Sequence, residues 1–195
     1  IRDSLGIGAF IITFSNKQKM TQKAEIAVGF GILFIGLSSM SSSIGVYQDS
    51  PVFYKAFQVL GGNPILGILV GAVVTAIIQS SSASVGILQT LAMRGIVNWR
   101  SAIFITLGQN IGTCITAILS SAGANKTAKR AAVIHLSFNV LGAAIYGVIM
   151  TIFFGIFPDL AMQHISSTQI SIFHSIFNIS VTILLFPFAN ALVKL

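Results

Sequence analysis

One stretch of this chain strongly limits what it can fold into: from Gly71 to Ala92 the sequence reads GAVVTAIIQSSSASVGILQTLA. The middle of this otherwise apolar run is polar and consists of Gln79, Ser80, Ser81, Ser82 and Ser84. In a bilayer, hydroxyl groups, amides and unwound backbone must find partners inside the protein or line a wet cavity. The polar break is therefore a candidate functional site.

The rest of the composition is typical of a membrane protein. Hydrophobic residues make up 54% of the chain and charged residues 8%, whereas soluble domains carry about 25% charged residues. Charge-free stretches such as 101–125 and 131–158 are long enough for a transmembrane helix, which needs about 20 apolar residues. We therefore expect a multi-pass protein of the cell membrane, with the lipid bilayer as its surroundings.

The net charge of +7 does not indicate a nucleic-acid partner, because the basic residues lie in short loops between apolar runs. Basic loops of this kind set the orientation of membrane helices. The single cysteine, Cys114, lies in an apolar run and excludes a disulfide within the chain.

The apolar runs predict an all-α fold over residues 1–195, with about five transmembrane helices and one re-entrant helical hairpin. The expected membrane segments are Leu5–Phe14 (the end of a span), Ala24–Val46, Ile103–Leu119, Ala131–Phe157 and Ile170–Val193. The stretch Pro64–Met93 is too long for one upright helix at about 1.5 Å rise per residue. We expect two half-helices that meet at the QSSS sequence.

The distribution of basic residues favours a hairpin over a single crossing. A hairpin places one large group on the same side of the membrane, made of Lys17, Lys19, Lys23, Lys126, Lys129, Arg130 and Lys194. Only Lys55, Arg94 and Arg100 then lie on the other side. By the positive-inside rule, this arrangement predicts a hairpin that enters from the outside and a cytoplasmic C-terminus.

The hairpin tip offers the chemistry of an anion site. The N-terminus of a helix carries roughly +0.5 of an elementary charge and unpaired N–H groups, which together hold anions. The expected anion ligands are Gln79, Ser80, Ser81, Ser82 and Ser84. From Pro64 onward no expected span contains Lys or Arg, so neutral donors would hold the anion and release it again.

Neutral oxygen atoms also suit a small hard cation such as sodium. The expected ion ligands are Thr75, Gln79, Gln109, Asn110, Thr113 and Thr116. Two later spans repeat a polar pair, in IHLSFN (134–139) and FHSIFN (173–178), where His and Asn lie on one helix face. His135, Asn139, His174 and Asn178 are expected to brace the spans around the site or to line its cavity.

The sequence supports an enzymatic function less well than an ion-binding or anion-binding one. Ser81 with His135 or His174 as a base would make a serine hydrolase, but three adjacent serines single out no nucleophile, and no glycine-flanked serine elbow is present. The spacing of His and Cys matches no usual metal site. We expect no enzyme activity, no cofactor and no metal other than sodium.

Three motifs in order, QSSSA, NIGT about thirty residues later and HxxFN beyond it, resemble the second half of the type II sodium–phosphate cotransporters in their bacterial form. The resemblance covers roughly Leu60 to Phe188. It implies sodium-driven symport of inorganic phosphate by two inverted repeats, each with a QSSS hairpin. It places phosphate and sodium around Gln79, Ser80, Ser81 and Ser82, with Asn110 and Thr113 among the ion ligands.

The chain departs from this family pattern in two respects. It has one QSSS sequence, so we expect it to be the second repeat, working with the missing first repeat or with a second copy of the chain. Cys114 stands where the family usually has threonine, which weakens a ligand role at that position. Two alternative functions remain: transport of another anion (arsenate, sulfate or an organic anion), and a regulatory membrane module that transports nothing.

Overall fold

The computed structural model describes residue 12 and residues 18–45, 59–60 and 63–188. The chain divides into two compact units, residues 1–46 and 47–195. The first unit contains α2 (Gln18–Gly45), which includes the expected Ala24–Val46 segment up to Gly45. The expected segment Leu5–Phe14 lies outside the described residues except for Ile12.

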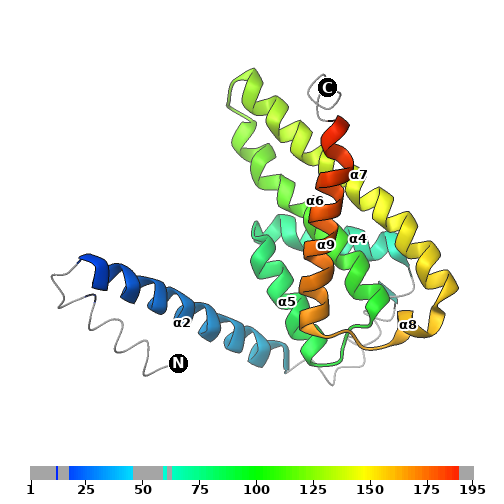
Figure 1. Cartoon of the computed structure of the whole chain (residues 1–195), viewed down its shortest axis with the longest axis horizontal. Coiled ribbons are helices and arrows are strands. Elements are labelled where there is room, and N and C mark those ends of the chain that lie inside the picture. The colour runs from blue at the N-terminus through cyan, green and yellow to red at the C-terminus, as the bar shows by residue number, and fades with distance from the viewer. Residues whose placement is uncertain (1–11, 13–17, 46–58, 61–62, 189–195) are drawn as a thin grey trace. The chain divides into compact units, whose positions relative to one another are not determined.

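The second unit carries the expected hairpin, followed by three long helices (Figure 1). The hairpin consists of α4 (Pro64–Ile78) and α5 (Ser81–Met93), which meet at Gln79 and Ser80. Pro64 occupies the first turn of α4, and the Asn63 side chain caps this helix by accepting hydrogen bonds from the N–H groups of Ile65 (3.0 Å) and Leu66 (3.4 Å). The prediction of two half-helices meeting at QSSS is confirmed.

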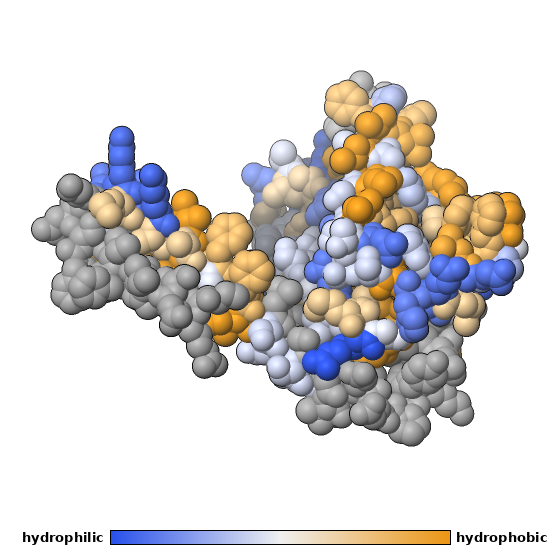
Figure 2. Space-filling view, turned by 60° about the horizontal axis from the view of Figure 1, so that its bottom comes forward, coloured by the Kyte–Doolittle hydropathy of each residue, from blue (hydrophilic) through white to orange (hydrophobic). Residues whose placement is uncertain are grey.

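The helices that follow are α6 (Trp99–Ser121), α7 (Lys126–Ile156), the short α8 (Pro158–Met162) and α9 (Ser167–Leu185), which continues into a 3-10 turn (Phe186–Phe188). Within the described residues, α6, α7 and α9 with its turn are long and apolar enough to cross a membrane. Many of their apolar side chains are exposed, for example Ile152 (59%) and Ile183 (69%). Figure 2 shows such apolar side chains over much of the visible surface, as expected for an all-α membrane protein.

Four expected boundaries need correction, three helix starts and one helix end. The helices α6, α7 and α9 begin three to five residues before the expected starts, because the side chains of Asn98, Asn125 and Ser166 cap them. The basic residues Lys126, Lys129 and Arg130 consequently lie on α7 rather than in a loop. The last helix was expected to reach Val193 but ends at Leu185 and continues only as the 3-10 turn, because Pro187 has no N–H to donate to the carbonyl four residues earlier; residues 189–195 lie outside the described part.

The hairpin packs on α6 with its first arm parallel to that helix. Added Cβ atoms at Gly67 and Gly71 would meet Phe104 and Ile105 respectively, and one at Gly112 would meet Ala72 and Thr75. The start of α4 therefore lies toward the start of α6, and the tip lies beside the middle of α6. Because α5 leads back to Trp99 through a short connection, the hairpin enters and leaves at the same end of α6.

Helices α7 and α9 complete the unit. Gly142 on α7 lies against Val181 on α9, and the Tyr146 ring packs edge-on against Phe177 with ring centroids 5.0 Å apart. These pairs make α9 antiparallel to α7. Asn98 also forms an isolated antiparallel bridge with His164, which joins the connection before α6 to the connection before α9.

Candidate functional site

The hairpin tip is a sharp turn with a capped helix on either side. Gln79 has φ 58° and ψ 22°, and it is the one residue other than glycine with positive φ in the described part of the chain. Its N–H donates to the Thr75 carbonyl at 2.7 Å, which ends α4. Ser80 is extended, and its Oγ accepts from the Ala83 N–H at 3.3 Å, which starts α5. A left-handed residue other than glycine costs about 1–2 kcal/mol, so the surroundings must hold this turn.

A buried network of three side chains, which we call the tip network, holds the two arms together and fixes them to α6. Thr75 Oγ1 on α4 donates to Ser84 Oγ on α5 at 2.7 Å. Gln109 Nε2 on α6 donates to both the Ser84 carbonyl (2.9 Å) and Ser84 Oγ (3.0 Å). All three residues are at most 2% exposed. Gln109 Oε1, in contrast, is buried without a hydrogen-bond partner in the described structure.

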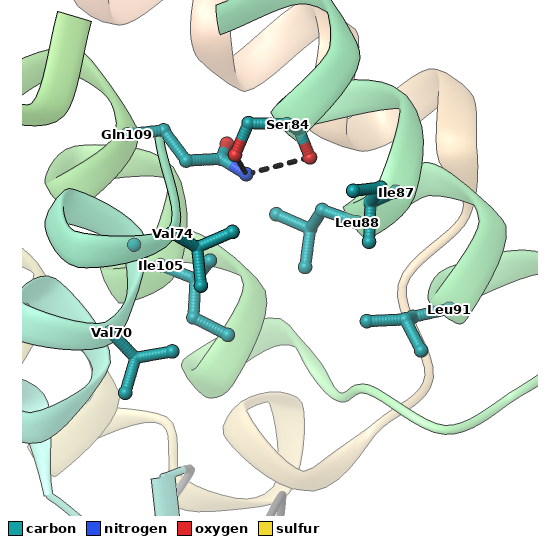
Figure 3. A pocket seen from close by; sticks show the side chains of 9 residues that line it. Val70, Val74, Ser84, Ile87, Leu88, Leu91, Ile105 and Gln109 are labelled. Carbon is teal, nitrogen blue, oxygen red and sulfur yellow. Dashed lines mark hydrogen bonds between the residues drawn. The ribbon is translucent and has the colours of Figure 1, made fainter. Parts of the chain in front are cut away.

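Two cavities flank the tip. The first, of about 110 Å³, lies between α4, α5 and α6 and has apolar walls formed largely by Val70, Val74, Ile87, Leu88, Leu91 and Ile105 (Figure 3). Figure 3 also shows Ser84 and Gln109 joined at one edge of this cavity. Its apolar walls leave few partners for a hydrated ion.

The second cavity, which we call the serine pocket, has a volume of about 250 Å³ and is lined by Ser81, Ser82, Val85 and His174. The two serines form the first turn of α5, and His174 comes from α9. The first N–H groups of a helix have no partner within it. The serine pocket therefore gathers two serines and one imidazole at the N-terminus of α5.

The sequence of the hairpin and of most of the helices that follow it in the chain matches a known family. The family model described as Na+/Pi-cotransporter matches residues 50–177. The chain belongs to this Na+/Pi-cotransporter family. The resemblance read from the three motifs is thereby confirmed at the level of the family.

The alignments with individual relatives cover different shares of this chain and of the relatives themselves. The uncharacterized protein YqeW of Bacillus subtilis is 30% identical over 97% of the chain and 61% of its own length. The putative inorganic phosphate export protein YjbB of Salmonella typhimurium is 23% identical over 96% of the chain and 34% of its own length. The sodium-dependent phosphate transport protein 2A of Rattus norvegicus is 33% identical over 63% of the chain and 21% of its own length.

The chain thus spans about three fifths of the length of the Bacillus relative and about a third or less of the other two. No solved structure matches the chain. Within the described residues, no three side chains of His, Cys, Asp or Glu gather in a way that would hold a metal ion.

The structure brings some of the sequence-predicted site residues together and separates others. Two groups form: Thr75, Ser84 and Gln109 in the tip network, and Ser81, Ser82 and His174 around the serine pocket. Asn110, Thr113 and Thr116 instead bond back to carbonyls of their own helix, at Thr106, Gln109 and Thr113. The ligand roles assigned to all of these residues stay predictions.

The repeated His–Asn pair has the same local structure in both copies. Asn139 Nδ2 donates to the His135 carbonyl at 3.0 Å, and Asn178 Nδ2 donates to the His174 carbonyl at 2.7 Å. His174 lines the serine pocket. The His135 carbonyl lies within 3.6 Å of Cys114 Sγ, which joins α7 to α6.

The sequence analysis missed the close contact between α4 and α6. Gly67 and Gly71 on α4, and Gly108 and Gly112 on α6, are each spaced by four residues, and added Cβ atoms at all four would lie between 1.9 and 2.8 Å from the other helix. Small residues with this spacing are typical of closely packed membrane helices. The four-residue spacing of the glycines was the available signal for this contact, and α6 runs without a break through Gly108 and Gly112.

Proposed function

We propose that this chain forms part of a sodium-coupled transporter of inorganic phosphate, in which the serine pocket binds phosphate. The observation that carries the proposal is the position of Ser81 and Ser82 at the start of a half-helix beside the middle of α6. Around this pocket the hydroxyls and N–H groups are donors, and phosphate oxygens are acceptors. The names of the rat and Salmonella relatives, both of which mention phosphate, agree with the proposal.

We further propose that Gln109 contributes to the sodium site. Its amide N–H groups are fixed on Ser84, so the orientation of the amide is set and Oε1 is left as a buried acceptor without a partner. A neutral oxygen at membrane depth suits a sodium ion. Asn110, Thr113 and Thr116 follow Gln109 along α6 and are the further ligands of the proposed sodium site.

Transport fits the pocket better than hydrolysis. A serine nucleophile needs a hydrogen bond to its base, and no hydrogen bond joins Ser81 or Ser82 to His174 in the part of the chain that the structure describes. Relatives whose names state a role are transport or export proteins. We therefore expect no hydrolase activity.

The first test is uptake of labelled phosphate into vesicles that contain the chain, alone and together with an upstream repeat. An inward sodium gradient should drive uptake in at least one of the two preparations, and a potassium gradient should not. Excess unlabelled sulfate, arsenate or an organic anion should compete weakly if phosphate is the substrate. Absence of sodium-dependent phosphate uptake in both preparations would contradict the proposal.

Ser81→Ala is the sharpest test of the site. A hydrogen bond to a charged group contributes about 1.5–3 kcal/mol, so losing the Ser81 hydroxyl should raise the KM for phosphate about tenfold or more. Ser120→Ala is the matched control, because Ser120 is exposed near the far end of α6. A wild-type KM in Ser81→Ala would refute this assignment.

A further inference from the structure

His174 reaches the serine pocket from a different helix than the serines do. Helix α9 lies against α5, where Gln89 Nε2 donates to Ser171 Oγ at 2.6 Å and to the Ser167 carbonyl at 3.4 Å. His174 lies one turn beyond Ser171, while Ser81 and Ser82 lie about two turns before Gln89. The two helices are therefore antiparallel, and this register places His174 opposite the start of α5.

The position of His174 on α9 is well fixed. The Asn178 side chain donates to the His174 carbonyl at 2.7 Å. The neighbouring Phe173 ring contacts Tyr146 on α7 with a centroid separation of 6.2 Å, and Tyr146 also hydrogen-bonds Ser180. Contacts on both sides of His174 thus hold α9 against α7, while the imidazole lies at the wall of the pocket.

We propose that the His174 imidazole donates a hydrogen bond to the phosphate held at Ser81 and Ser82, so that α9 supplies a ligand of the substrate. This inference rests on the proposed function, because it assumes that the serine pocket binds phosphate. A neutral imidazole has one N–H donor, and it adds a donor to the pocket without the permanent charge of Lys or Arg. His135, the counterpart in the repeated motif, is not among the residues that line the serine pocket.

The experiment compares substitutions of His174, His135 and His164 in sodium-driven phosphate uptake. His174→Phe keeps a planar ring but removes the donor, and it should raise the KM for phosphate about tenfold. His174→Gln restores an N–H donor and should recover most of this loss. His164→Phe is the control, because His164 is exposed in the connection before α9, and its KM should match that of the wild type.

A second measurement does not depend on transport. Phosphate that binds the folded protein raises its thermal midpoint, and at a given phosphate concentration tighter binding gives a larger rise. With sodium present, phosphate should raise the midpoint of the wild type and of His174→Gln, and should raise that of His174→Phe much less.

Three outcomes would overturn the role of His174: a wild-type KM with a full thermal shift in His174→Phe, equal impairment in His174→Gln and His174→Phe, or an equal loss of phosphate affinity in His135→Phe. If Ser81→Ala raises the KM and His174→Phe does not, only the role of His174 is wrong. If neither substitution changes the KM, the proposed phosphate site is wrong as well.

Discussion

Gly108→Ala should prevent the hairpin from docking on α6 and should yield a protein that unfolds or aggregates on extraction. A Cβ at position 108 would lie 1.9 Å from the Ile68 carbonyl oxygen and 2.8 Å from the Ala72 nitrogen. Both atoms belong to the α4 backbone, so no change of rotamer relieves the overlap. Overpacking typically costs about 1–3 kcal/mol, occasionally more, and a contact between two backbones belongs at the upper end.

The measurement is the thermal unfolding midpoint in detergent, together with the fraction of monodisperse protein. Gly71→Ala should behave like Gly108→Ala, because its Cβ would lie 2.1 Å from the Ile105 carbonyl oxygen. Gly155→Ala is the matched control: it is also a helical glycine, and nothing lies within 4 Å of its added Cβ. A Gly108→Ala protein as stable as Gly155→Ala would show that α4 and α6 do not pack as described.

The sequence predicted the hairpin well, because its signals are local. Pro64 and Asn63 start a helix by fixing φ and by capping, and the serines at 80–82 combine a cap with a polar break. The charge distribution is a separate signal for the hairpin, because Arg94 and Arg100 lie near the start of α6 and Lys126 follows its end. Each of these signals can be interpreted from the order of residues along the chain and the thickness of a bilayer, without knowing how the helices pack.

The packing of the same helices was much harder to predict. A helix that is apolar on every side gives no hydrophobic pattern that identifies its buried face. The positions of Gly67, Gly71, Gly108 and Gly112 were visible, but the pairing of α4 with α6 depends on which of several helices lies next to the hairpin.

The site residues likewise include some whose role depends on local structure and others whose role depends on helix packing. Asn110 and Thr113 are polar and lie in a span, as ligands would, but their side chains bond to the carbonyls four residues earlier. The sequence does not distinguish a polar side chain that hydrogen-bonds a carbonyl of its own helix from one that binds a ligand. Conversely, Gln109 and His174 stand out only once α6 and α9 are placed beside the hairpin.

Gln109→Leu should have the second large effect, because it removes the only donor that fixes the hairpin tip to α6 in the tip network. The substitution takes hydrogen bonds from the buried Ser84 carbonyl and from Ser84 Oγ. A typical buried hydrogen bond contributes about 0.5–1.5 kcal/mol, so we expect a loss of about 2 kcal/mol. Gln163→Leu, at an exposed glutamine in the connection before α9, should change the unfolding midpoint little.

A double-mutant cycle separates the network from the individual bonds. Ser84→Ala leaves Thr75 Oγ1 without its acceptor, and Thr75→Val removes one of the two donors to Ser84 Oγ, whereas the double variant removes both members of the pair. The combined loss should therefore be smaller than the sum, with a coupling of about 0.5–3 kcal/mol. Exact additivity of the two losses would mean that the arms are held by apolar packing alone.

The hydrogen bonds of the tip network do not involve Ser81 or Ser82, as the proposed phosphate site requires. The strained turn at Gln79 needs external support, and the supporting bonds run through Thr75, Ser84 and Gln109 rather than through Ser81 or Ser82. Gln109→Leu should thus reduce the maximal rate of phosphate uptake as well as stability, because a tip that moves no longer presents its N–H groups in a fixed geometry. Full uptake by a destabilised Gln109→Leu protein would show that the tip keeps its shape without α6.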